Sequence, residues 1–223
     1  MLLKLTPEHI LTSFHKAKNK ESKLDSFVLS IMGMSSERNR HFLNNLMSVD
    51  GLSYLEVGCW RGSTACSALY KNNITKSLLI DNFSEFGKDF LETDKEWDNG
   101  VSIRNDLENN LLAFTDGKSR FIDADFFKTD LSKHGKFDVF FYDGCHDFEP
   151  QSKALEYAID SLSDTFLFIV DDYSFPVVKS ATKHSLESLS SKIKIQYSLE
   201  LEREEPIKEW WWHGLYIGLL SKV

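Results

Sequence analysis

Acidic side chains follow two hydrophobic segments of the chain, at the point where each segment ends. The run FDVFFYDGCH occupies residues 137–146 and contains Asp143, and the run FLFIVDDY occupies residues 166–173 and contains Asp171 and Asp172. His146 follows Asp143 after three residues. In an open parallel sheet, ligands bind just beyond the carboxyl ends of the strands. Three carboxylates and a histidine at such strand ends predict a hard metal ion with a base beside it.

Convergent carboxylates repel one another, and a divalent cation would offset that repulsion. Oxygen ligands favour Mg²⁺, Mn²⁺ or Ca²⁺ over zinc, and the single thiol of Cys145 does not make a zinc set. Simpler roles remain open for some of these residues. His146 could cap the helix expected near Pro150, and one acid of the pair at 171–172 could cap the helix expected near Pro176.

A glycine turn marks a second candidate site. The segment YLEVGCWRG at residues 54–62 predicts a strand, a tight turn with Gly58 and Gly62, and a helix from Ser63. The two glycines allow a close backbone approach to a ligand, and the helix start favours an anionic group. Asp81 ends the next predicted strand, where a carboxylate can accept hydrogen bonds from both hydroxyls of a ribose. An ordinary strand–helix turn is the alternative for the glycines.

Strands and helices alternate after residue 52, which predicts a parallel sheet with helices on both faces. The last two strand-like segments, 193–201 and 211–220, predict a hairpin that adds an antiparallel strand. Helical spacing dominates the first fifty residues. We therefore expect an α/β protein with a helical N-terminal cap over residues 1–50 and a ligand-binding domain over residues 51–223.

Composition limits the classes of partner. The 223 residues include 26 basic and 34 acidic side chains, a formal net charge of −8, which argues against nucleic acid and anionic membranes. Three cysteines form no CxxC pair, and no stretch has the length and apolar character of a signal peptide or membrane span. These features predict a reduced, cytoplasmic protein with a small-molecule substrate.

The glycine turn and the acids that follow it resemble the class I S-adenosylmethionine-dependent methyltransferases. The pattern ExGxxxG occupies residues 56–62, and the resemblance extends from about residue 52 to the C-terminus. It implies a Rossmann-like methyltransferase fold, a seven-stranded mixed sheet of order 3-2-1-4-5-7-6 with strand seven antiparallel. It also implies S-adenosylmethionine as cofactor, with the methionine part at the glycine turn. Its implied binding residues are Glu56, Gly58, Gly62, Asp81, Asp125 at the adenine amino group, and Phe126.

A narrower resemblance comes from DGxHxxE at residues 143–149 and VDDY at residues 170–173. These motifs are similar to those of metal-dependent O-methyltransferases, in particular the macrocin and mycinamicin sugar O-methyltransferases and the cephalosporin-hydroxylase-like group. The similarity implies that Asp143, Asp171 and Asp172 bind Mg²⁺, or another divalent cation such as Mn²⁺, and that His146 is the general base. Which acid of the pair binds the metal more directly stays open.

We therefore expect an O-methyltransferase that acts on a hydroxylated small molecule, more in keeping with a sugar or glycosylated metabolite than with a catechol. Two rivals are a nucleotide-dependent oxidoreductase and a non-catalytic methyltransferase-like binding protein. The absence of GxGxxG argues against the first, and the intact set of three acids and a histidine argues against the second.

Three questions stay open at the level of sequence. Residues 210–212, WWW, could bind substrate or pack in the core, and packing is favoured. Residues 83–100 form the longest irregular stretch and could be a mobile loop at the active site. The apolar faces of the N-terminal helices could pair subunits into a homo-oligomer or pack on their own sheet.

Overall fold

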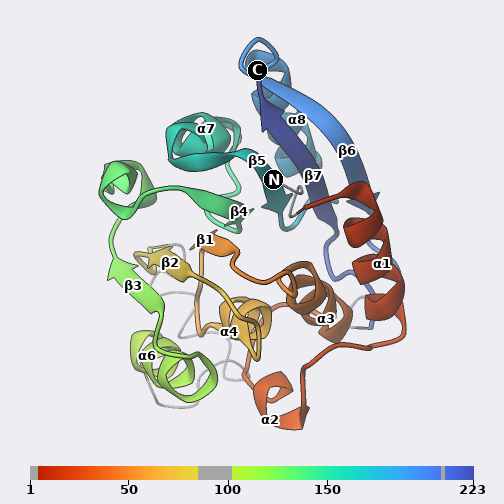
Figure 1. Ribbon diagram of the computed structural model, residues 1–223, viewed down its shortest axis with the longest axis vertical. Helices are drawn as coiled ribbons and strands as arrows, with labels where there is room; N and C mark the ends of the chain where they lie inside the picture. Colours follow the sequence, from red (N-terminus) through yellow and green to blue (C-terminus); the bar gives the residue numbers. More distant parts are fainter. Residues whose placement is uncertain (1–4, 85–101, 207–208) are drawn as a thin grey trace.

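The computed structural model describes residues 5–84, 102–206 and 209–223. Its centre is a seven-stranded sheet of order β3-β2-β1-β4-β5-β7-β6, as predicted (Figure 1). Strands β1 to β5 run parallel, and β7 runs antiparallel to both of its neighbours. The strands are β1 (Ser53–Val57), β2 (Lys76–Asp81), β3 (Ser119–Asp123), β4 (Phe137–Tyr142), β5 (Leu162–Val170), β6 (Ile193–Leu201) and β7 (Leu215–Lys222).

Helices cover both faces of this sheet, and Figure 1 shows α7 and α8 on one side and α3 and α4 on the other. The α-helices are α1 (Pro7–Lys18), α2 (Ser26–Leu29), α3 (Glu37–Leu46), α4 (Ser63–Leu69), α6 (Ile103–Phe114), α7 (Phe148–Ala158) and α8 (Pro176–Ser188). Three short 3₁₀ helices accompany them, η1 (Phe126–Lys128), η2 (Leu131–His134) and η3 (Ile159–Ser161). No helix within the described residues is long and apolar enough to cross a membrane.

The N-terminal helices begin at side chains that satisfy free backbone N–H groups. The Thr6 hydroxyl accepts a hydrogen bond from the N–H of His9 at 3.2 Å, and the Ser36 hydroxyl accepts one from the N–H of Asn39 at 3.1 Å. Apolar side chains of both helices, such as Ile10 of α1 and Phe42 of α3, then join the same core as α4. Residues 5–50 thus share a core with the sheet, and the division of the chain at residue 50 remains a prediction.

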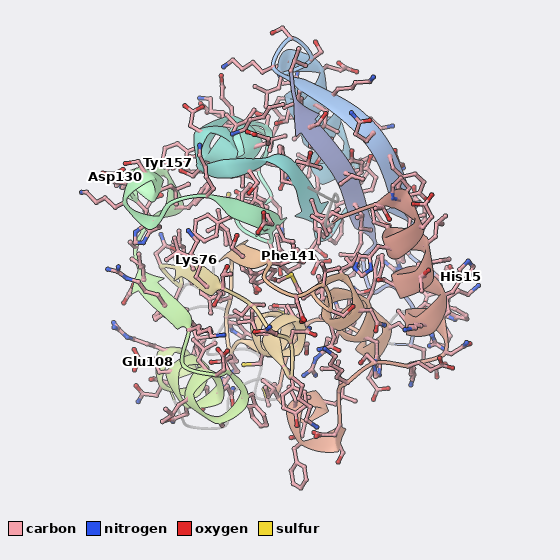
Figure 2. The ribbon with its side chains drawn as sticks, in the orientation of Figure 1. His15, Lys76, Glu108, Asp130, Phe141 and Tyr157 are labelled. Carbon is pink, nitrogen blue, oxygen red and sulfur yellow. The ribbon has the colours of Figure 1, made fainter. Side chains whose placement is uncertain are left out.

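Alternate side chains of β4 enter the two layers of the core because successive residues of a strand point to opposite faces. Val139 and Phe141 belong to the layer with the N-terminal helices, and Phe140 and Tyr142 belong to the layer with α7 and α8. Figure 2 shows Phe141 in the interior of the molecule, whereas His15 and Asp130 lie at its periphery.

The carboxyl ends of the three central strands lie in one row. Val57 of β1 is in register with Tyr142 of β4, which is in register with Val170 of β5. The backbone ladder continues one residue further, since the N–H of Asp143 donates to the Val57 carbonyl at 2.9 Å and the N–H of Asp171 donates to the Tyr142 carbonyl at 3.1 Å. The acids that follow β4 and β5 are therefore neighbours of the glycine turn that follows β1.

The C-terminal hairpin differs from the prediction at one end. Strand β6 begins and ends as expected, but β7 begins at Leu215, and residues 209–213 form a turn before it. The tryptophan run therefore lies outside the strand. Trp211 alone is a core residue with 2% exposure, while Trp210 and Trp212 are only partly buried.

Candidate active site

One cavity of about 590 Å³ lies at the carboxyl ends of the parallel strands. It joins the candidate nucleoside site and the candidate metal site in a single space. Its walls come from the turn after β1, the ends of β2 and β3, the segment after β4, the segment after β5, and the turn before β7. The predicted site residues that line it are Gly58, Asp81, Asp125, Phe126, Asp143, His146, Asp171 and Asp172.

The glycine turn after β1 fits its position because no side chain is possible there. Gly58 has φ +85°, and a Cβ at this residue would lie 1.7 Å from the Asp143 carbonyl oxygen. Only glycine combines this conformation with such close contact between two strand ends. The turn therefore brings bare backbone to the cavity beside the segment that carries Asp143.

Two backbone N–H groups from different segments fix the carboxylate of Asp81. Its carboxylate accepts hydrogen bonds from the N–H of Trp60 at 2.8 Å and from the N–H of Phe83 at 2.7 Å. Burial raises the pKa of this carboxyl, and the two backbone donors work in the opposite direction. Each carboxylate oxygen has a further lone pair, so Asp81 can still accept hydrogen bonds from vicinal hydroxyls.

Asp125 and Phe126 form the far end of the cavity at the start of η1. Asp125 accepts a hydrogen bond from the N–H of Phe127 at 2.9 Å, and the Phe126 ring packs on Phe140 with 5.9 Å between ring centroids. A carboxylate beside an aromatic ring suits an amino-substituted planar base, because the ring offers a stacking surface and the acid accepts from the amino group.

Glu56 and Gly62 do not line the cavity, although direct cofactor binding was expected of both. Glu56 is fully buried below the turn, where it accepts hydrogen bonds from the hydroxyls of Tyr54 and Thr64, each at 2.6 Å. Gly62 has φ +84° and precedes α4, and a Cβ there would lie 2.8 Å from Leu107. Both residues contact the buried side of the turn. Their position therefore supports an indirect role, in which they fix the shape of the turn, instead of direct contact with the cofactor.

Three potential metal-ligating side chains meet at the other end of the cavity. Ligand atoms of Asp143, His146 and Asp172 all lie within 4.8 Å of one another. The His146 Nε2 atom is 3.2 Å from an Asp172 carboxylate oxygen and 3.6 Å from one of Asp143. Asp171 also lines the cavity but is not part of this three-residue cluster. His146, predicted as base, is thus placed among the predicted ligands.

The acids of this cluster suit a divalent cation on electrostatic grounds. Burial raises the pKa of Asp171 well above its ordinary value, and the neighbouring charges of Asp143 and Asp172 raise it further. Such crowding is costly without a positive charge among the oxygens. Two or three carboxylates, with or without one imidazole nitrogen, form a donor set that Mg²⁺ and Mn²⁺ accept.

Trp212 and His213 also line this end of the cavity. The sequence left open whether the tryptophan run binds substrate, favoured packing, and indicated no partner for His213. Strand β7 is antiparallel to β5, with Tyr216 in register with Val170, so the turn before β7 opens beside the acids that follow β5. The strand order could have identified both residues. A strand that runs antiparallel to β5 begins at the edge of the sheet where the parallel strands end, so the turn before it lies at the site. The predicted irregular stretch 83–100 lies outside the described residues from 85 onward.

Comparison with known proteins places these features in context. A family model described as "Methyltransferase domain" matches residues 55–173. No curated protein sequence matches the chain. The fold is similar to an SAH-bound methyltransferase from Podospora anserina, with 12% identity, TM-score 0.57, and coverage of 98% of this chain and 89% of that one.

Two further structures show the same fold. Cofactor-bound Rv0187 from MTB has 16% identity and TM-score 0.56, with 98% of this chain and 92% of that one covered. TrmN from Thermus thermophilus has 13% identity and TM-score 0.55, with 88% of this chain and 52% of that one covered. The chain thus spans about half the length of TrmN, and two other matched structures are covered to 48% and 50%.

Proposed function

Because the chain belongs to the methyltransferase domain family, we propose that it is an S-adenosylmethionine-dependent O-methyltransferase that uses a divalent cation. The observation that carries this proposal is the single cavity in which Asp81 and Asp125 occupy one end and the cluster of Asp143, His146 and Asp172 occupies the other. A methyl donor and a hydroxyl acceptor could meet in that space.

The donor end offers each part of S-adenosylmethionine a matching group. The bare backbone at Gly58 suits the methionine part, Asp81 suits the ribose hydroxyls, and Asp125 with Phe126 suits the adenine. Gly58 touches the Asp143 backbone, so the sulfonium end would lie nearest the acidic cluster. This orientation directs the methyl group toward the acceptor, and positioning supplies much of the rate of such displacements.

Asp143, Asp171 and Asp172 would hold Mg²⁺ or Mn²⁺. The cation, when bound, would lower the pKa of an acceptor hydroxyl and orient its oxygen. His146 would accept the hydroxyl proton on its imidazole. The acceptor oxygen forms a bond to the methyl carbon as the carbon–sulfur bond breaks, its electron pair stays on sulfur, and S-adenosylhomocysteine results. Asp172, 3.2 Å from His146, would stabilise the imidazolium.

The geometry also favours a second assignment for one residue. Since His146 lies within the three-residue cluster, it could be a metal ligand. Asp171, which is outside the cluster, would then not bind the metal directly. A titration with Mn²⁺ separates the two roles. With His146 as the base, His146→Asn abolishes methyl transfer but leaves Mn²⁺ affinity unchanged. With His146 as a ligand, Mn²⁺ affinity falls together with activity.

The acceptor class is the finest part of the proposal. Similarity of residues 143–149 and 170–173 to sugar O-methyltransferases of the macrocin and mycinamicin type supports a sugar or glycosylated metabolite. A catechol is the alternative acceptor. Methyl transfer from radiolabelled S-adenosylmethionine to matched panels of glycosides and catechols, with and without chelator, tests both the acceptor and the metal.

Calorimetry with S-adenosylhomocysteine tests the proposal at its base. We expect binding at about micromolar strength in the wild type, and loss of at least about tenfold in affinity in Asp81→Ala, which loses its acceptors for the ribose hydroxyls. Asp130→Ala, at an exposed acid that does not line the cavity, is the matched control. Failure of the wild type to bind S-adenosylhomocysteine would refute the proposed function.

A further inference from the structure

The turn before β7 supplies a wall of the cavity that the predicted cofactor, metal and base residues leave unused. We propose that Trp212 and His213 form the acceptor-recognition element of this site and take an uncharged, hydroxylated ring. The ring would lie against the indole and form a hydrogen bond with the His213 imidazole. This inference rests on the proposed methyltransferase function and extends it to residues outside the predicted motifs.

Position is the first argument. Trp212 and His213 share the cavity with Asp172 and His146. The donor-end residues lie on the other half of the sheet, where Asp81 ends β2 and Asp125 follows β3. A molecule that places a hydroxyl beside His146 would therefore meet this turn with its remaining atoms. Phe175, with its ring centroid 4.8 Å from that of His213, continues the same aromatic wall.

The turn is also held firmly from behind, as a recognition element must be. The N–H of Ser174 donates to the His213 carbonyl at 2.8 Å. A Cβ on Gly214, which has φ +90°, would lie 2.4 Å from the Ser174 hydroxyl oxygen. Trp211, buried between the turn and the N-terminal helices, stacks on Phe14 with 5.4 Å between ring centroids.

Trp212 itself adopts a left-handed backbone conformation, with φ +53°. This conformation costs a non-glycine residue roughly 1 kcal/mol or more, and such residues gather at functional sites. The conformation separates the neighbouring side chains, since Trp211 enters the core while Trp212 faces the cavity. A residue that merely filled the core would need no such turn.

His213 offers a polar group to this apolar wall. Its Nδ1 atom is enclosed without a hydrogen-bond partner among the described residues. A neutral imidazole carries one donor and one acceptor nitrogen, and a hydroxyl can serve either of them. The indole face of Trp212 suits the C–H surface of a ring that carries such hydroxyls.

Charge decides against an anionic acceptor. Among the described residues that line the cavity there are five aspartates, Asp81, Asp125, Asp143, Asp171 and Asp172, and no lysine or arginine. One divalent cation would offset only part of the charge of five carboxylates, so a phosphate or carboxylate on the acceptor would still enter a negative site with no lysine or arginine to pair with it. An uncharged ring carries no such penalty.

Saturation-transfer NMR on the intact protein, loaded with S-adenosylhomocysteine and Mg²⁺, tests the inference. The probes are a panel of methyl glycosides and, for comparison, glucose 6-phosphate. We expect saturation transfer to the glycosides and little to the phosphate. Trp212→Leu and His213→Phe should each weaken glycoside binding about three- to tenfold, the effect of one lost contact, and leave S-adenosylhomocysteine affinity unchanged. His213→Phe keeps the ring against Phe175 and removes only its nitrogens.

Matched controls separate recognition from folding. Trp210→Leu changes an indole that packs on Arg38 at 4.3 Å outside the cavity lining, and His184→Phe changes a histidine on α8, so neither should alter glycoside binding. Equal binding in Trp212→Leu, His213→Phe and wild type would overturn the inference, as would preference for the phosphate or no transfer to any glycoside. These failures differ from loss of S-adenosylhomocysteine binding, which would refute the methyltransferase proposal itself.

Discussion

Glu56 is a buried carboxyl whose removal should stabilise the protein in a pH-dependent way. Its side chain is fully buried and accepts hydrogen bonds only from the hydroxyls of Tyr54 and Thr64 among the described residues. Burial raises its pKa from the ordinary 4.5 to about 7, the two hydroxyl donors oppose the rise, and the charge of Asp81 adds to it. Glu56→Gln keeps the shape of the side chain and removes its charge. We therefore predict that the variant becomes increasingly more stable than the wild type as pH rises.

The sign follows from the two pKa values. The folded state binds a proton on Glu56 up to about pH 7, whereas the unfolded chain releases it above about 4.5. The cost of burying the charge is thus absent at low pH, grows between these values and is complete above the folded pKa. At about 1.4 kcal/mol per pH unit, the full cost is about 3 kcal/mol.

Urea unfolding of wild type and Glu56→Gln at about pH 5 and pH 8 measures this cost. The stability difference between variant and wild type should increase by about 2–3 kcal/mol over that range, because part of the cost is already present at pH 5. Taking the difference removes other titrating groups. Glu108→Gln, at an exposed position on α6, is the control and should show no such increase. A pH-independent difference for Glu56→Gln would refute the reasoning.

Three further changes test packing and ligand binding. Gly58→Ala should cost more than about 3 kcal/mol or prevent folding, because its Cβ would lie 1.7 Å from the Asp143 carbonyl, while Gly117→Ala, with nothing within 4 Å, should cost only about 1–2 kcal/mol by thermal unfolding; similar costs would contradict this. Trp211→Ala should lower stability by about 3–5 kcal/mol in urea, and a loss below about 1 kcal/mol would show that the indole is not a core anchor. Asp172→Asn should weaken Mn²⁺ binding by calorimetry at least about tenfold, and unchanged affinity would remove it from the ligand set.

The architecture of the sheet was accessible from the sequence because its three central strands, β1, β4 and β5, are hydrophobic runs followed by glycine or acids. The alternation of strands and helices indicated a parallel sheet, and the resemblance of residues 56–62 to methyltransferases supplied the strand order that the structure confirms. The juxtaposition of Asp143 and Asp171 then follows from adjacent parallel strands.

The burial of individual side chains and their contacts with distant segments could not be predicted from the sequence. Glutamate is a residue type that often contacts ligands, but Glu56 is the next-to-last residue of β1 and is buried beneath the turn. Trp211 and Trp212 were expected at the start of a strand, with packing favoured for the tryptophan run. The turn before β7 instead sends Trp211 into the core and Trp212 toward the cavity, and contacts with Phe14 and Ser174 decide this outcome. Such contacts join segments more than 30 residues apart, so local pattern carries no record of them.

The contact between Gly58 and the Asp143 backbone has a consequence for how this site could acquire new ligands. The donor-side turn and the acid-bearing strand end interlock at van der Waals distance, so neither can shift without the other. We therefore expect this half of the site to be rigid. Met34, Phe175, Trp212 and His213, by contrast, reach the cavity from outside the ladder of parallel strands. New acceptors are therefore most easily acquired by exchanging these rim positions, and a chimaera that transplants residues 209–214 is the natural unit of such an exchange.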